Sequence, residues 1–232
     1  MKDQNALQGI AQVVPASTAT MELYGHGPIE RIHAEEYHQL GNVGPHRHRD
    51  FTGGRACARR ALHSLGELYP PALLKLDDRQ VRWPSGYVGS ITHTRGYVAA
   101  AVASHHDIQS IGIDAELEHR AKESIWKAIM TPSEIDWVNT LPTDLKLPAA
   151  TLLFSARESY YKCQFTISRS WVGFHDVYVT LDHPDSWMTN QPNLHGQFTV
   201  HPIKKLPLEG TAWSGTFYWA SPLILTAMTL PH

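Results

Sequence analysis

The chain has 232 residues, of which 20 are Lys or Arg and 22 are Asp or Glu, giving a formal net charge of −2. A hydrophobic content of 42% with only 18% charged residues can bury a core, which excludes a globally disordered chain. The near-neutral balance argues against general nucleic-acid binding. Two cysteines cannot build a disulfide scaffold and no apolar stretch is long enough to span a membrane, so we expect a soluble, cytoplasmic protein.

The first half of the chain is predicted to be one helix followed by strands. Asp50–Leu65 is expected to be helical, because apolar residues recur at i, i+3, i+4 and i+7 from Ala58, and Gly66 is a natural helix stop. Tyr97–Ala103 is an unbroken apolar run, and a second run, Ile108–Glu116, follows after a short polar turn. Two runs joined in this way predict an antiparallel pair of strands packed on both faces.

The second half has the same predicted order. The Thr-Pro-Ser-Glu sequence at 131–134 is a capping box that starts a helix, and Pro148–Phe165 carries the apolar stripe of a longer one. Strand-like runs follow at Val172–Leu181, Gln197–His201, Trp213–Ala220 and Leu223–Thr229, with a loop over Asp182–Gly196. We therefore expect an α+β protein of two pseudo-symmetric halves, residues 1–113 and 114–232, each a helix packed on a small, mainly antiparallel sheet.

A pair of carboxylates is the first chemical signal. Asp114 and Glu116 end the second apolar run, and residues i and i+2 of a strand point to the same face. Two adjacent, partly buried carboxylates repel each other unless a cation lies between them, and a hard divalent ion such as Mg²⁺ suits such oxygen ligands. The alternative is a strand end that opens into solvent, with both acids hydrated.

Three further signals involve groups that bind phosphate or metal. Glu158 and Lys162 are four residues apart and share a helix face, although an ordinary exposed ion pair has the same spacing. Gly89–Thr94 brings backbone N–H groups, hydroxyls and the His93 imidazole together, which suits a phosphate oxygen, although His93 can also be purely structural.

The basic residues give the remaining signal. Arg47 and Arg55 flank the start of the first helix and Lys75 follows it, which suits a phosphate-rich ligand as well as a solvated helix face. The sequence contains 15 histidines, and His46, His48, His105 and His106 are the candidates for a zinc site, but none forms a His-Glu-x-x-His helix.

Taken together and in order, these motifs resemble the Sfp-type 4′-phosphopantetheinyl transferases of the holo-acyl-carrier-protein synthase superfamily. The segments that carry the resemblance are Gly54–Arg59, Trp83–Gly86, Gly89–Thr94, Ile111–Glu116 and Phe154–Lys162. The sequence differs from the usual family pattern in two ways that keep the chemical groups. Arg157 stands where many relatives have Lys, so the positive charge is kept, and Thr92 and Thr94 replace serines, so the hydroxyls are kept. The resemblance implies a pseudo-twofold pair of α+β halves with coenzyme A bound at their junction.

The resemblance also implies catalytic and metal-binding roles. Asp114, Glu116 and Glu158 match the Mg²⁺ ligands of the family, and Lys162 and His93 match contacts to the diphosphate of coenzyme A. Glu158, or a magnesium-bound water that it orients, is the implied base.

Other matched residues would hold the nucleotide. Arg47 and Arg55 match the positions that grip the 3′-phosphate, with Arg49 as the alternative to Arg47. Lys75 and Thr92 match further contacts to coenzyme A.

The implied reaction moves 4′-phosphopantetheine from coenzyme A to a serine of an apo acyl or peptidyl carrier protein and releases 3′,5′-ADP. Mg²⁺ is the implied cofactor and a monomer the implied state, with neither nucleic acid nor membrane as a partner. A catalytically inactive coenzyme A-binding module and a zinc-dependent hydrolase are the alternatives.

Overall fold

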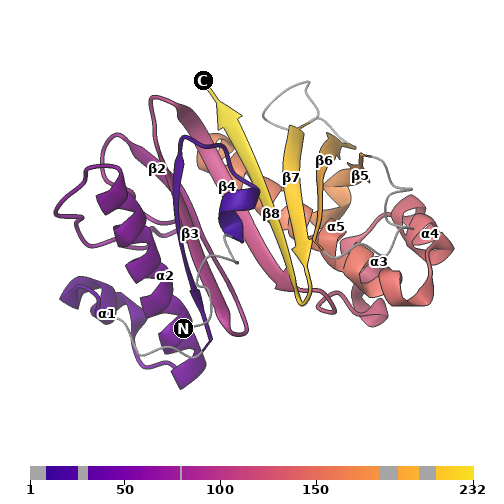
Figure 1. Cartoon of the computed structure of the whole chain (residues 1–232), viewed down its shortest axis with the longest axis horizontal. Helices are drawn as coiled ribbons and strands as arrows, with labels where there is room; N and C mark the ends of the chain where they lie inside the picture. Colours follow the sequence, from indigo (N-terminus) through magenta and orange to yellow (C-terminus); the bar gives the residue numbers. More distant parts are fainter. Residues whose placement is uncertain (1–8, 26–30, 79, 183–192, 204–212) are drawn as a thin grey trace. The chain divides into compact units, whose positions relative to one another are not determined.

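The computed structural model describes residues 9–25, 31–78, 80–182, 193–203 and 213–232. Within them the protein is α+β, as predicted, with helices packed on two sheets (Figure 1). The chain divides into two compact units, one of residues 1–111 with 229–232 and one of residues 112–228. No helix in the described ranges combines the length and the apolar composition that crossing a membrane requires.

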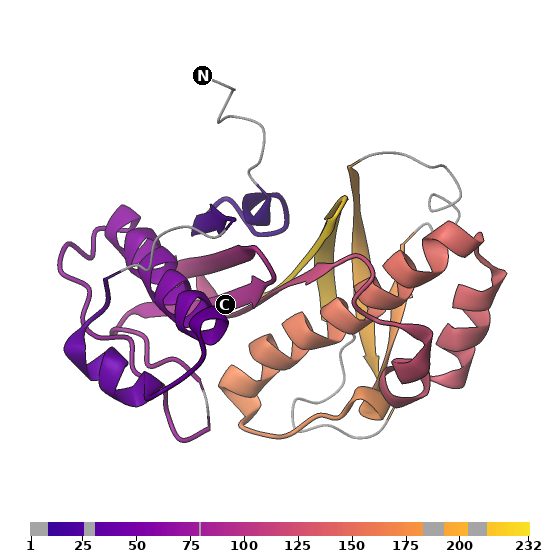
Figure 2. The ribbon, with the colours of Figure 1, turned by 90° about the horizontal axis from the view of Figure 1, so that it is seen from below.

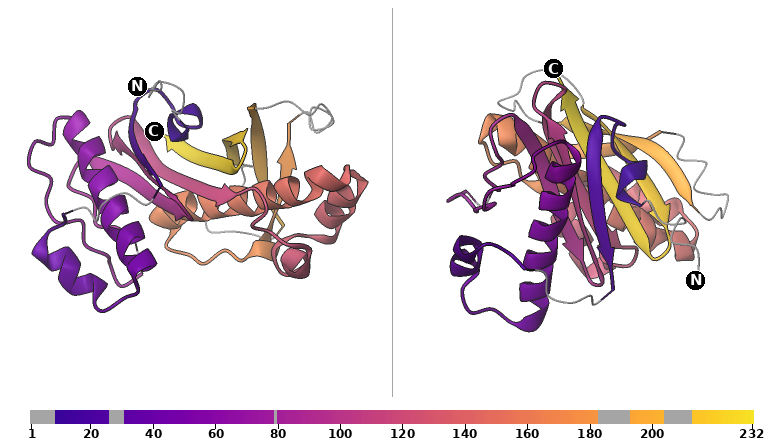
Figure 3. Two further views of the ribbon diagram at one scale, coloured as in Figure 1. Left: turned by 60° about the horizontal axis from the view of Figure 1, so that its bottom comes forward. Right: turned by 60° about the vertical axis from the view of Figure 1, so that its left-hand side comes forward.

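The first unit contains a three-stranded antiparallel sheet in the order β1–β3–β2, with the helix α2 across one face (Figures 1 and 3). Its elements are η1 (Ile10–Gln12), β1 (Thr18–Tyr24), α1 (Ala34–Leu40), α2 (Pro45–Ser64), β2 (Tyr87–Thr94) and β3 (Tyr97–Ser104). The alanine-rich β3 is buried from Tyr97 to Ala103, because β1 and β2 flank it and α2 covers it. Helix and sheet pack so closely that a Cβ at Gly54 would lie 2.8 Å from the Ile91 side chain.

The strand pairing predicted for the two apolar runs is wrong. β3 pairs with β1 along one edge and with β2 along the other, so it has no free edge for the run that follows. That run forms β4 (Ile108–Leu117), the edge strand of the second sheet. No strand was predicted at β1, although Thr18–Tyr24 alternates polar residues with the apolar Ala19, Met21 and Leu23, which pack against the core as one face of the strand.

The second unit contains most of a five-stranded sheet in the order β4–β8–β7–β6–β5, with α5 packed against its face (Figures 1 and 2). Its elements after β4 are η2 (Glu123–Ile125), α3 (Trp126–Ile129), α4 (Pro132–Thr140), α5 (Thr143–Ser168), η3 (Phe174–Asp176), β5 (Val177–Leu181), β6 (Leu194–Pro202), β7 (Trp213–Ala220) and β8 (Leu223–Pro231). Neighbouring strands from β5 to β8 pair antiparallel.

Several predicted boundaries differ from the structure. The capping box is confirmed, since Thr131 caps α4 and the Glu134 side chain reaches back to it. Both long helices begin earlier than predicted, and Pro148 lies inside α5. β5 begins only at Val177, after a 3₁₀ turn, and β6 begins at Leu194, inside the predicted loop. The rest of that loop, residues 183–192, lies outside the described residues.

Candidate functional site

The first group of candidate side chains lies on β4 and α5 in the second unit. Asp114 and Glu116 are two residues apart on β4, and Glu158 and Lys162 are one turn apart on α5. The spacing on each element places its two side chains on one side, as the sequence predicted. The strand and the helix therefore contribute three carboxylates and one ammonium group.

A glycine lets this strand and this helix approach each other. A Cβ on Gly112 would overlap the carbonyl oxygen of Ser159 and lie 2.6 Å from the backbone nitrogen of Cys163. Backbone packs on backbone at this point, so any side chain at position 112 pushes β4 away from α5.

Asp114 is held from both sides. The Lys162 ammonium donates to its Oδ1 at 2.7 Å and to the carbonyl oxygen of Ile113 at 2.9 Å. The hydroxyl of Ser155 donates to Oδ2 at 2.8 Å, and lies 2.9 Å from the hydroxyl of Thr226. The helical spacing therefore identified Lys162, but its ion pair in the structure is with Asp114 rather than with Glu158.

The other two carboxylates are destabilised as anions. Burial, and after it the negative charge of Asp114, raise the pKa of Glu116 to about 7 against the opposing effect of Arg120. Burial also raises the pKa of Glu158, again with Asp114 adding to the effect and Lys162 opposing it. Both shifts have the same cause, because negative charges are gathered where water is partly excluded.

The donor set suits a hard divalent cation. Three carboxylates supply only oxygen ligands, and a cation among them would relieve the repulsion that raises the pKa values of Glu116 and Glu158. As it stands, the described part of the chain contains no group of three or more His, Cys, Asp or Glu side chains arranged to hold a metal ion. That finding applies to the three carboxylates of β4 and α5, and at Asp114 the positive charge is supplied by the Lys162 ammonium. It applies equally to the histidines proposed as zinc ligands.

The second group lies in the first unit, where the N-terminal part of α2 meets the end of β2. A guanidinium nitrogen of Arg47 lies 3.3 Å from Nε2 of His93, and Oδ2 of Asp50 lies 3.4 Å from Nδ1 of the same ring. Thr92, the preceding residue of β2, is buried, whereas His93 is exposed. The structure thus brings Arg47 and His93 together, with an aspartate that the sequence did not single out.

Arg55 is a buried cation with an unsatisfied donor. Its side chain lies over the ring of Phe51 at 4.6 Å, and its Nε has no hydrogen-bond partner in the described structure. Burial lowers the pKa of Arg55 to about 10, with Glu36 opposing the shift and the nearby Arg59 and Arg47 adding to it. A buried guanidinium among other cations is costly, and an anionic ligand would offset that cost.

Lys75 lies on a segment that α1 holds in place. The carboxamide of Gln39 accepts from the backbone nitrogen of Lys75 at 2.7 Å and donates to its carbonyl oxygen at 3.0 Å. Two residues earlier, the nitrogen of Leu73 donates to the buried carboxylate of Glu36 at 2.7 Å, and Arg59 pairs with that carboxylate. The backbone of Lys75 is therefore fixed while its side chain is exposed.

A cavity of about 150 Å³ lies beside Glu158 in the second unit. Tyr161 and Trp171 contribute to its wall, and their rings meet edge to face at 5.1 Å. Trp171 is 76% exposed although it is large and apolar, and the ring of Tyr161 also stacks on Phe165 at 5.2 Å. An aromatic surface of Tyr161, Phe165 and Trp171 thus borders a carboxylate of the first group.

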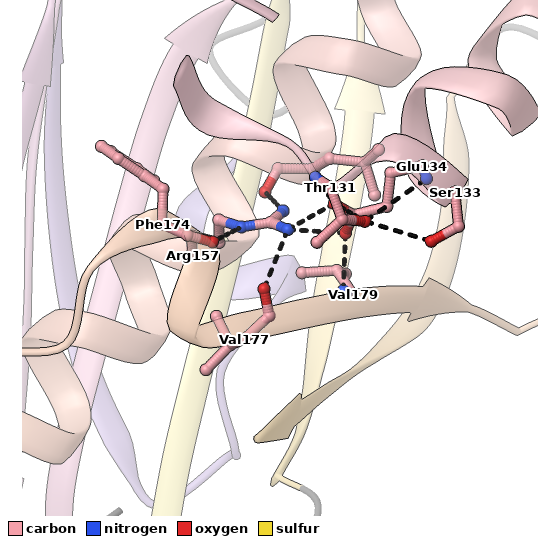
Figure 4. Close-up of polar contacts among 8 residues, drawn as sticks. Thr131, Ser133, Glu134, Arg157, Phe174, Val177 and Val179 are labelled. Carbon is pink, nitrogen blue, oxygen red and sulfur yellow. Dashed lines mark hydrogen bonds and ion pairs between the residues drawn. The ribbon is translucent and has the colours of Figure 1, made fainter. Parts of the chain in front are cut away.

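Arg157 turns away from solvent into a buried network (Figure 4). Its guanidinium donates to both carboxylate oxygens of Glu134 at 2.6 Å and to the carbonyl oxygens of Phe174 and Val177 at 3.2 and 3.3 Å. Glu134 also accepts from the backbone nitrogen of Val179 at 2.7 Å. The positive charge that precedes Glu158 therefore joins α5 to α4 and β5.

Several residues that contact the candidate residues were not predicted from the sequence, and three of them serve as examples. They are Asp50 at His93, Ser155 at Asp114 and Gln39 at Lys75. Ser155 lies inside a motif that carried the resemblance, so its position was a usable signal. Asp50 and Gln39 gave no signal in the sequence, because each contacts a residue more than thirty positions away in the chain.

Comparison with known proteins gives the same family along most of the chain. A family model described as the 4′-phosphopantetheinyl transferase N-terminal domain matches residues 35–103, and one described as the 4′-phosphopantetheinyl transferase superfamily matches residues 110–209. The chain is 38% identical to 4′-phosphopantetheinyl transferase Npt of Nocardia iowensis over 76% of this chain and 78% of that protein.

Two further relatives extend this similarity. 4′-Phosphopantetheinyl transferase PptT of Mycobacterium tuberculosis is 34% identical over 89% of this chain and 87% of its own. Enterobactin synthase component D of Escherichia coli is 34% identical over 71% of this chain and 76% of its own. Fold, candidate groups and relatives together define a transferase of the phosphopantetheinyl class. The chain belongs to the 4′-phosphopantetheinyl transferase superfamily.

Proposed function

We propose that this protein transfers 4′-phosphopantetheine from coenzyme A to a serine hydroxyl of an apo acyl or peptidyl carrier protein and releases 3′,5′-ADP, the reaction of a holo-acyl-carrier-protein synthase. The observation that carries the proposal is the group of Asp114, Glu116, Glu158 and Lys162, whose crowded carboxylates suit a divalent cation next to a diphosphate. Membership of the family supports it.

The basic group of the first unit would bind the nucleotide end of coenzyme A. Arg47 and Arg55 grip the 3′-phosphate, since a guanidinium fork binds two phosphate oxygens at once and the Nε of Arg55 lacks a partner in the described structure. His93 contacts the diphosphate, Lys75 makes a further contact to the nucleotide, and Thr92 lies next to His93 on β2. Both groups would act on one coenzyme A molecule.

The carboxylate group would hold Mg²⁺ through Asp114, Glu116 and Glu158. When bound, Mg²⁺ neutralises negative charge on the diphosphate. Lys162 stabilises the same phosphate oxygens with its ammonium group. Glu158 accepts the proton of the carrier serine, directly or through a water.

The bond changes follow from these roles. The serine oxygen attacks the phosphorus next to pantetheine, and a new oxygen–phosphorus bond forms there. The bond from that phosphorus to the oxygen it shares with the nucleotide breaks, and 3′,5′-ADP leaves with the bonding electron pair. Lys162 and His93 offset the negative charge that develops on the phosphate oxygens.

The surface near Glu158 would receive the pantetheine arm and the carrier protein. The cavity next to Glu158 is walled by Tyr161 and Trp171, which suits the slender, partly apolar pantetheine chain. The exposed Trp171 beside it is the kind of large aromatic residue that anchors a protein partner. This placement brings the carrier serine to the carboxylate that takes its proton.

Mass spectrometry tests the proposal directly. An apo carrier protein is incubated with this protein, coenzyme A and Mg²⁺, and we expect a carrier that gains one phosphopantetheine group. Several carriers, from siderophore, nonribosomal-peptide, polyketide and fatty-acid synthesis, are compared. The similarity to enterobactin synthase component D favours a siderophore or related pathway. No adduct on any carrier would contradict the proposal.

Two alternatives make different predictions in the same assay. An inactive coenzyme A-binding module would bind coenzyme A tightly and modify no carrier. A zinc hydrolase would contain tightly bound zinc by elemental analysis. A monomeric state, a cytoplasmic location and the absence of nucleic-acid or membrane partners stay predictions.

A further inference from the structure

A cavity of about 380 Å³ opens beside His93 in the first unit. The α2 side chains of His46, Arg49 and Asp50 line it, β2 contributes His93, and the β2–β3 turn contributes Arg95. Among its described lining residues, Asp50 is the only carboxylate. No second carboxylate among the described residues of this wall could therefore take the place of Asp50 at His93.

His93 meets α2 through both of its ring nitrogens. Nε2 lies 3.3 Å from the guanidinium of Arg47, and Nδ1 lies 3.4 Å from Oδ2 of Asp50. A guanidinium can only donate, so Nε2 accepts and carries no proton. The single ring proton of neutral His93 is then on Nδ1, where it faces the Asp50 carboxylate. The two contacts together select one tautomer of His93.

A phosphate oxygen at the same nitrogen changes this requirement. The oxygen is an acceptor, so Nε2 must carry a proton to bind it, and the ring becomes an imidazolium with protons on both nitrogens. The carboxylate of Asp50, already at Nδ1, stabilises that cation and fixes the plane of the ring. The same division of roles between a carboxylate and histidine occurs in catalytic triads and at many metal-binding histidines, where an imidazole presents one defined nitrogen to its reaction partner.

We propose that Asp50 is a positioning residue that orients His93 and stabilises its imidazolium when Nε2 binds a phosphate of coenzyme A, an inference that rests on the proposed function. The other described polar groups that line this cavity or contact the ring are cationic or neutral: Arg47, His46 and Arg49 from α2, Arg95 and Tyr97 from the β2–β3 hairpin, and Tyr24 from β1. None of them can replace a carboxylate at Nδ1.

Three substitutions at Asp50 separate charge from hydrogen bonding. Asp50→Ala removes both, Asp50→Asn keeps an acceptor but removes the charge, and Asp50→Glu restores the charge. Because hydrogen bonds to charged groups contribute strongly, Asp50→Ala should weaken coenzyme A binding about tenfold in calorimetry, and Asp50→Glu should recover most of it. The Michaelis constant for coenzyme A should rise more than the turnover number falls.

Nitrogen NMR of the His93 ring gives a readout that a merely structural role would not produce. With coenzyme A bound, we expect protons on both ring nitrogens in the unchanged protein, and a smaller population of this imidazolium in the Asp50→Ala variant at the same pH. An equal population of the imidazolium in both coenzyme A-bound proteins overturns the proposal.

A double-mutant cycle with His93→Ala distinguishes the possible failures. If Asp50 acts through His93, Asp50→Ala has no further effect on coenzyme A binding in the His93→Ala background. Normal binding by Asp50→Ala together with weakened binding by His93→Ala overturns this proposal alone. Normal binding by His93→Ala overturns both this proposal and the role of His93 in the proposed function.

The chain contains a matched control. His106 and Asp107 form a second His–Asp contact, at 3.2 Å, on an exposed turn of the same unit. Asp107→Ala should leave coenzyme A binding unchanged. A loss as large as that of Asp50→Ala would contradict an effect specific to His93.

Discussion

Glu158 is the residue at which the proposed chemistry is tested most sharply. Without its carboxylate the serine proton loses either its acceptor or the group that orients the accepting water, so Glu158→Ala should lower transfer to an apo carrier by about a hundredfold or more, the usual range for general base catalysis. The substitution should not destabilise the folded protein. Burial and the negative charge of Asp114 raise the pKa of Glu158. At a pH above the ordinary pKa of a glutamate, the ionised side chain therefore lowers the free energy of unfolding. Full activity of the variant would overturn the mechanism.

Urea unfolding at neutral pH supplies the control for this variant. The midpoint of Glu158→Ala should equal or exceed that of the unchanged protein, because the repulsion from Asp114 is gone. A clearly lower urea midpoint would mean that the variant loses activity because its fold is less stable.

Gly112 is predicted to be irreplaceable for a steric reason. A Cβ at this position overlaps the Ser159 carbonyl oxygen, and backbone cannot move aside as a flexible side chain can. We expect Gly112→Ala to lower the free energy of unfolding by about 2 kcal/mol or more, as overpacking of a core does. Denaturant titration measures this loss. Gly44→Ala is the comparison, since a Cβ there would meet nothing within 4 Å.

Residues within one local motif could be predicted from the sequence, whereas their distant partners could not. The i, i+2 spacing of Asp114 and Glu116 and the i, i+4 spacing of Glu158 and Lys162 follow from strand and helix geometry alone. The ion pair of Lys162 with Asp114 joins residues 48 positions apart. No local pattern predicts such a contact, because it depends on how β4 packs on α5.

At the scale of elements, the pair of Glu134 and Arg157 holds α4, α5 and β5 together. Both side chains are almost fully buried, at 5% and 2% exposed. Removing one partner leaves a buried charge, so Glu134→Ala or Arg157→Met should each cost about 3–5 kcal/mol of unfolding free energy. The double variant should cost less than the sum of the two. Urea unfolding of all three variants measures the coupling.

An exposed cation nearby serves as the control for this pair. Lys127→Met on α3 removes a charge from the surface and should leave the unfolding midpoint unchanged. Strictly additive effects of Glu134→Ala and Arg157→Met would show that the two side chains do not stabilise each other.

Elements with a strong local signal were predicted and those defined by their neighbours were not. The capping box of α4 is a local hydrogen-bond pattern, and it is present. β1 is the exception, because Ala19, Met21 and Leu23 alternate with polar residues and yet no strand was predicted there, and its Glu22 carboxylate accepts from Tyr97 and from the backbone of Gly9 and Ile10. The wrong pairing of β3 follows from this omission, since β1 takes the edge that β4 was expected to occupy.

At the scale of the whole molecule, the formal charge of −2 conceals two local groups of opposite character. The first unit contributes the cations around Arg47 and Arg55, and the second the carboxylates around Asp114. Composition alone could exclude bulk polyanion binding but could not predict this separation. It arises because the residues concerned lie far apart in the sequence and gather only in the folded units.

This separation predicts that coenzyme A stabilises the whole protein only when a divalent cation is present. Coenzyme A carries several negative charges, and the carboxylate group would repel its diphosphate unless a cation lies between them. With Mg²⁺ and coenzyme A at about a hundred times its dissociation constant, linkage adds about 2.7 kcal/mol, which should raise the melting temperature by about 5–10 °C. With a chelator the rise should largely disappear, and Glu116→Gln should reduce it in the presence of Mg²⁺. Thermal unfolding with and without coenzyme A, each with and without Mg²⁺, measures the change in melting temperature. If coenzyme A raised the melting temperature equally with and without the metal, the carboxylates would not hold a cation for coenzyme A.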